Sequence, residues 1–66
     1  MQVVKFNKKI YTNEAVNQAI EEFKNLADFD IKNTNNYFEI KIDKIDNDVK
    51  NVLPDEFANY VLALLS

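Results

Sequence analysis

The sequence contains no cysteine, no histidine and no glycine, and its single proline is Pro54. Disulfide bonds need cysteine, and structural zinc sites are built from cysteine and histidine, so neither kind of staple is open to this chain. The same absences remove the cysteine nucleophile and histidine, the most frequent acid–base residue of enzymes. Without glycine, no glycine-rich phosphate loop can form. We therefore expect a protein that is not an enzyme and binds no cofactor or metal.

Arginine is also absent, so all positive charge comes from lysine. Eight lysines are outnumbered by eleven acidic residues, and the formal net charge is −3. Proteins that bind nucleic acids usually gather Lys and Arg on one face, so a nucleic-acid partner is not expected. The chain has neither a run of about 18 apolar residues nor the pattern of a secretory signal. These features predict a protein without a membrane span, located in the cytoplasm.

A length of 66 residues predicts a single small domain over residues 1–66. A domain of this size buries only about 60% of the surface that its unfolded chain exposes, so its stability is modest. At about 0.05–0.15 kcal/mol per residue, the expected free energy of unfolding is about 3–10 kcal/mol. Since disulfides and metals are excluded, stability must come from a compact core or from association. We expect a homo-oligomer or a complex with another protein.

The clearest pattern in the sequence is an amphipathic helix over about residues 13–27. Its apolar residues fall at i, i+3, i+4 and i+7: Val16, Ala19, Ile20 and Phe23. Thr12 or Asn13 can cap the helix by accepting a hydrogen bond from a free backbone N–H group of the first turn.

Three segments have the composition of β-strands: residues 1–6, 29–32 and 37–43. The third alternates most clearly, with Phe38, Ile40 and Ile42 on one face, and we place it at the centre of a sheet. Residues 33–36 form an asparagine-rich turn between the second and third strands. Because the chain has no glycine, we expect asparagine to adopt the left-handed conformations that such turns often need.

Pro54 suits the first turn of a second helix, over about residues 54–65. The order of the elements is then strand, helix, strand, strand, helix. This order predicts an α+β fold of two layers, in which two helices cover one face of a three-stranded sheet.

The C-terminal helix has an unusual composition, because no charged residue follows Glu56 and Leu62 lies away from the main apolar stripe. A helix that is apolar over most of its circumference is buried on more than one side. Either another chain covers the second side, or the helix inserts deeply into its own core. The sequence leaves both alternatives open.

Four residues are candidates for an interaction site: Tyr37, Asn59, Leu62 and Leu65. Tyr37 falls on the outward face of the third strand, where it is either an ordinary surface aromatic or part of a docking surface. Uncovered strands of a small sheet can accept a peptide as an extra strand. The acidic residues Asp43, Asp46 and Asp48 do not have the spacing of an EF-hand loop, and we assign them to a connector.

Two segments of the chain resemble a known family of small proteins. The first is Tyr11-Thr12-x-Glu14-Ala15-Val16-x-x-Ala19-x-x-x-Phe23, and the second is Glu56-Phe57-Ala58-Asn59-Tyr60-Val61-Leu62. In this pattern the chain resembles the HxsD-like accessory proteins of His-Xaa-Ser systems, and the order of strands and helices agrees over residues 3–62.

This resemblance implies a non-catalytic accessory protein that is encoded beside radical-SAM enzymes, which modify ribosomally made peptides. Such a protein would bind the precursor peptide or dock on the enzyme. The iron–sulfur cluster would belong to the enzyme, because this chain has no cysteine to ligate one. The alternative is a small homodimeric protein with a structural or regulatory, antitoxin-like role.

Overall fold

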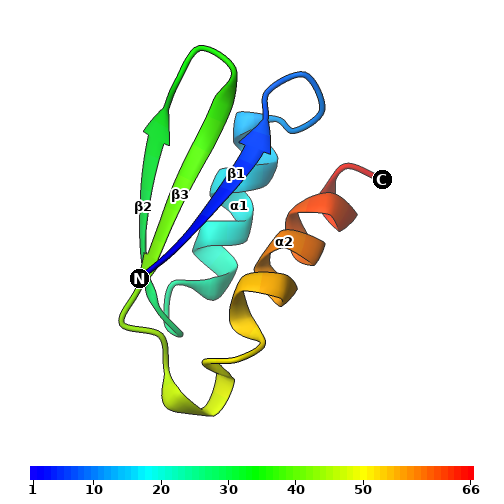
Figure 1. The fold of residues 1–66 in the computed structure, drawn as a ribbon. Coiled ribbons are helices and arrows are strands. Elements are labelled where there is room, and N and C mark those ends of the chain that lie inside the picture. The colour runs from blue at the N-terminus through cyan, green and yellow to red at the C-terminus, as the bar shows by residue number, and fades with distance from the viewer.

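The computed structural model describes residues 1–66 as a sheet with two helices on one face (Figure 1). The elements in chain order are β1 (Gln2–Asn7), α1 (Asn13–Phe23), β2 (Asp28–Asn33), β3 (Tyr37–Asp43), the short 3-10 helix η1 (Asn47–Val49) and α2 (Leu53–Leu64). The strand order is β1-β3-β2, with β3 antiparallel to both neighbours. The predicted α+β fold of β-α-β-β-α order is confirmed.

β3 lies at the centre of the sheet because its alternating residues satisfy both faces. Phe38, Ile40 and Ile42 point toward the helices and are buried. Tyr37 and Lys41, at alternate positions, are exposed on the opposite side. Strand alternation thus separates an apolar face, which the helices cover, from a polar face that is open to solvent.

α1 begins where the sequence predicts, but it ends four residues earlier. The Oγ1 atom of Thr12 accepts a hydrogen bond from the N–H of Ala15 at 3.1 Å, which caps the helix. After Phe23 the chain turns, and the N–H of Leu26 donates to the Phe23 carbonyl at 2.9 Å. The predicted end at residue 27 was wrong because Leu26 and Ala27 pack against the core from this turn, which prolongs the apolar pattern beyond the helix.

The β2–β3 turn closes without the left-handed asparagine that we expected. β2 continues through Asn33, and the N–H of Thr34 donates to the Tyr37 carbonyl at 2.9 Å. The N–H of Tyr37 donates in return to the Thr34 hydroxyl oxygen at 3.0 Å. Because this side chain takes the place of a backbone acceptor, Asn35 and Asn36 keep negative φ angles. The prediction was wrong: Lys44 is the residue with positive φ, at 50°.

The conformation of Lys44 predicts that Lys44→Gly stabilises the protein by about 0.5–1 kcal/mol. A residue with a Cβ atom in the left-handed region costs about 1–2 kcal/mol, which the substitution removes. Glycine loses more conformational entropy on folding, and this loss offsets about 0.5–1 kcal/mol of the stabilisation. Urea denaturation measures the change. Lys50→Gly is the matched control, because Lys50 has a right-handed φ of −52° and should lose stability. An equal loss of stability in Lys44→Gly and Lys50→Gly would contradict the left-handed conformation of Lys44.

α2 supplies the largest fully buried side chain, that of Phe57. Pro54 lies in the first turn, where its missing N–H would have no partner. The Phe57 ring is fully buried and contacts the rings of Phe6, Phe23 and Phe29 at centroid distances of 6.0, 5.7 and 4.9 Å. One residue thereby joins both helices to two strands. Neither helix is long and apolar enough to cross a membrane.

Candidate interaction surface

Three sides of α2 have different surroundings. Phe57 and Val61 point into the core, and both are fully buried. Tyr60 lies on the side of α1, with its ring 5.5 Å from that of Phe23. α2 also contacts β1, the strand at one edge of the sheet (Figure 1). On the side of α2 opposite Tyr60, the helical period places the residues that we call the outer flank: Ala58, Leu62 and Leu65.

The outer flank is apolar and incompletely covered. Ala58 and Leu65 are half-buried, and Leu62 is 52% exposed. α2 therefore inserts into its own core on one side only. Leu62 is not a core residue of this chain.

The structure separates the four predicted interaction residues. Leu62 and Leu65 lie together on the outer flank, and Asn59 is exposed on the neighbouring solvent side of α2. Tyr37, which is 42% exposed, lies on the open face of the sheet, across from the helices. Since successive residues of a strand point to opposite faces, the burial of Phe38 places Tyr37 on the other surface.

The open face beside Tyr37 is polar and charged. Glu39 at its centre lies between Lys5 on β1 and Lys32 on β2, its cross-strand neighbours on either side. Lys41 likewise lies opposite Asp30 on β2. Opposite charges in adjacent strands suit a face that remains in water, so this face does not need a partner to cover it.

β1 is an edge strand, so part of its backbone N–H and carbonyl groups have no hydrogen-bonding partner in a neighbouring strand. The N–H of Lys8 donates to the Asn36 carbonyl at 2.9 Å, and bonded pairs alternate along an antiparallel ladder. With the observed register, the even-numbered residues of β1 bond to β3. Val3, Lys5 and Asn7 therefore direct their N–H groups away from the sheet, and Val3 and Lys5 also direct their carbonyls there. The predicted central position of residues 37–43 already makes β1 an edge strand, whereas the outward direction of these backbone groups follows only from the observed register.

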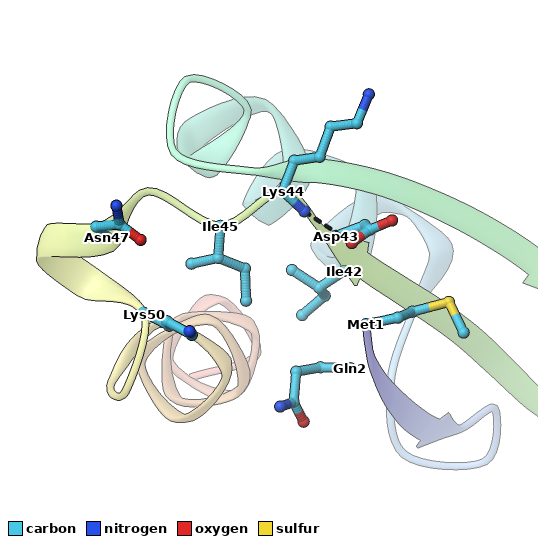
Figure 2. Close-up of a pocket in the computed structure, with 8 residues that line it drawn as sticks. All are labelled: Met1, Gln2, Ile42, Asp43, Lys44, Ile45, Asn47 and Lys50. Atoms are coloured by element: carbon cyan, nitrogen blue, oxygen red, sulfur yellow. Dashed lines mark hydrogen bonds between the residues drawn. The ribbon is translucent and has the colours of Figure 1, made fainter.

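A polar hollow of ≈ 230 Å³ lies where β1 begins and β3 ends. Figure 2 shows Ile42, Ile45 and Lys50 around it, whereas the side chain of Lys44 extends away. The carboxylate of Asp43 accepts a hydrogen bond from the Lys44 N–H at 2.9 Å. The lining combines one carboxylate, that of Asp43, with the exposed lysines Lys44 and Lys50, and no buried polar side chain points into the hollow.

An apolar hollow of ≈ 190 Å³ lies between the end of α1, η1 and the start of α2. Phe23, Leu26 and Leu53 form part of its wall, and Val52 at its rim is 51% exposed. It is separated from the outer flank, because Phe23 lies on the α1 side of α2.

The acidic connector after β3 has a structural role. The Asp46 Oδ1 atom accepts a hydrogen bond from the N–H of Asp48 at 2.9 Å and so caps η1. The Asp46 N–H donates to the Leu26 carbonyl at 2.8 Å, which ties the connector to the turn after α1. These contacts agree with the predicted connector.

Comparisons of the chain with models of protein families, with curated proteins and with solved structures found no match.

Proposed function

We propose that this protein is a non-catalytic accessory protein of the cytoplasm that binds a peptide or protein partner. The partner is a precursor peptide, or the radical-SAM enzyme that modifies that peptide. The proposal combines the resemblance to HxsD-like proteins with the physical character of α2.

The observation that carries the binding role is the outer flank of α2. After Glu56 the helix has no charge, and Leu62 is half exposed although it stands among apolar residues. Leaving apolar surface in water costs about 25 cal/mol per Å², so a partner that covers the flank gains that free energy. The motif around Asn59 belongs to the resemblance to HxsD-like proteins, and it supports a partner of the kind that the resemblance implies.

Co-expression with the products of the neighbouring genes, among which the proposal expects a radical-SAM enzyme and a precursor peptide, tests the proposal. We expect one of the two to co-purify with it in a fixed ratio through size-exclusion chromatography. Failure of both to associate would overturn the proposal. Sedimentation of the protein alone tests the homodimeric alternative, because a tight dimer without other ligands would favour that role instead.

A further inference from the structure

The helix layer is wide enough to cover one more strand than the sheet contains. Packed helices lie about 8–10 Å apart, and paired strands lie about 4.8 Å apart, so two helices cover about four strands. The sheet has three. A fourth strand could pair with either edge of the sheet, beside β1 or beside β2.

The two edges differ in what the helix layer offers to a fourth strand. Beside β1, α2 presents the outer flank, which is apolar. On α1, the small buried residues Ala15 and Ala19 allow close packing against α2. The side toward β2 is therefore the other side of the helix, where Asn17 and Lys24 are both exposed. An added strand buries alternate side chains against the helices, so it requires an apolar flank below it. The β1 edge fulfils this requirement and the β2 edge does not.

The β1 edge also differs from the rest of the protein in charge. Residues 1–11 contain three lysines, Lys5, Lys8 and Lys9, and no acidic residue, whereas all eleven acids lie further along the chain. Lys5 is exposed on the open face of the edge strand, beside the outward N–H and carbonyl groups. A strand paired with β1 would place its own outward side chains next to Lys5, where acidic residues are favoured.

From these three features we infer that the β1 edge and the outer flank together bind an extended peptide segment as a fourth strand. Acidic residues of the segment lie on the open face beside Lys5, and its apolar residues alternate with them and pack on Leu62 and Leu65. This inference rests on the proposed function and specifies the chemistry of the partner.

A second copy of the chain is a poorer occupant of this edge. Pairing of two β1 strands would bring Lys5 of one copy next to lysine of the other, and like charges on neighbouring strands are destabilising. Lysine on an edge strand is a known means of preventing such self-pairing. The same lysine favours an acidic strand.

The test uses the full chain and two terminally blocked peptides of about nine residues, a usual strand length. In one peptide valine alternates with glutamate, and in the other lysine replaces every glutamate. NMR titration should show binding of the glutamate peptide, with shifts at Val3, Lys5 and Leu62. At saturation, amide hydrogen exchange at Val3 and Lys5 should slow by about tenfold or more.

Two variants with the same charge change supply the control. Lys5→Glu and Lys32→Glu each place glutamate beside Glu39, but on opposite edges of the sheet. Lys5→Glu should lower the affinity for the glutamate peptide about tenfold, whereas Lys32→Glu should leave that affinity unchanged. Val3→Pro, which removes an outward N–H without breaking the β1–β3 ladder, should also weaken binding.

Several results would overturn the edge site: equal binding of both peptides, no binding of either, equal effects of both glutamate variants, or protection of Val3 by self-association without peptide. An enzyme or precursor complex that survives both Val3→Pro and Lys5→Glu would overturn the edge site and leave the proposed function standing. If the protein without substitutions forms no complex with the enzyme or the precursor peptide, the proposed function itself would be overturned.

Discussion

Replacing Phe57 with alanine is expected to leave most of the protein unfolded at room temperature. Removal of a buried phenylalanine side chain costs about 3–5 kcal/mol, and the whole domain has about 3–10 kcal/mol. The loss should lie at the upper end, because the ring contacts Phe6, Phe23 and Phe29, which belong to three different elements. Far-UV circular dichroism during urea denaturation measures the change.

Leu62→Ala is the matched control for Phe57→Ala. It removes a large apolar side chain from the same helix, but from a position that is 52% exposed. Its cost should be about 0.5 kcal/mol, as is usual for surface substitutions. Similar urea midpoints for the two variants would show that Phe57 does not hold the core together.

Two adjacent residues of α2 should respond in opposite ways to the same substitution. Val61→Glu should unfold the domain, since Val61 is fully buried and an unpaired charge in a core costs several kcal/mol. Leu62→Glu should leave the urea midpoint nearly unchanged, because its side chain reaches water. If the proposed function is correct, Leu62→Glu should also abolish co-purification with the enzyme or the precursor peptide.

Ala63→Glu is the control for the binding part of this experiment. Ala63 is exposed on α2 but lies off the outer flank, so its substitution should preserve both the fold and the complex. A complex that tolerates Leu62→Glu, or that is lost equally with Ala63→Glu, would show that the outer flank is not the interface. Unfolding of Leu62→Glu would show that Leu62 belongs to the core.

Side-chain periodicity made most of the fold predictable. The alternation in β3 correctly indicated that Phe38, Ile40 and Ile42 face the core, and the 3.6-residue period placed Val16 and Ala19 on the buried side of α1. Such patterns are local, because each follows from the geometry of one helix or one strand. They also indicated that Leu62 lies off the main stripe of α2.

Turns and helix ends were less predictable, since they depend on which group accepts each backbone hydrogen bond. The Thr34 hydroxyl accepts the N–H of Tyr37, and that bond removes the need for left-handed asparagine. The positive φ is instead at Lys44, where the chain leaves β3 for the connector. Residue composition alone does not distinguish these outcomes.

The sequence by itself determined the two-layer α+β architecture, the core face of each element and the uncharged character of α2. Only the tertiary structure decided that the outer flank of α2 lies beside the β1 edge of the sheet. It also placed Tyr37 on the opposite surface from Leu62 and Leu65. The physical reason is that faces follow from local periodicity, whereas neighbours follow from how separate elements pack together.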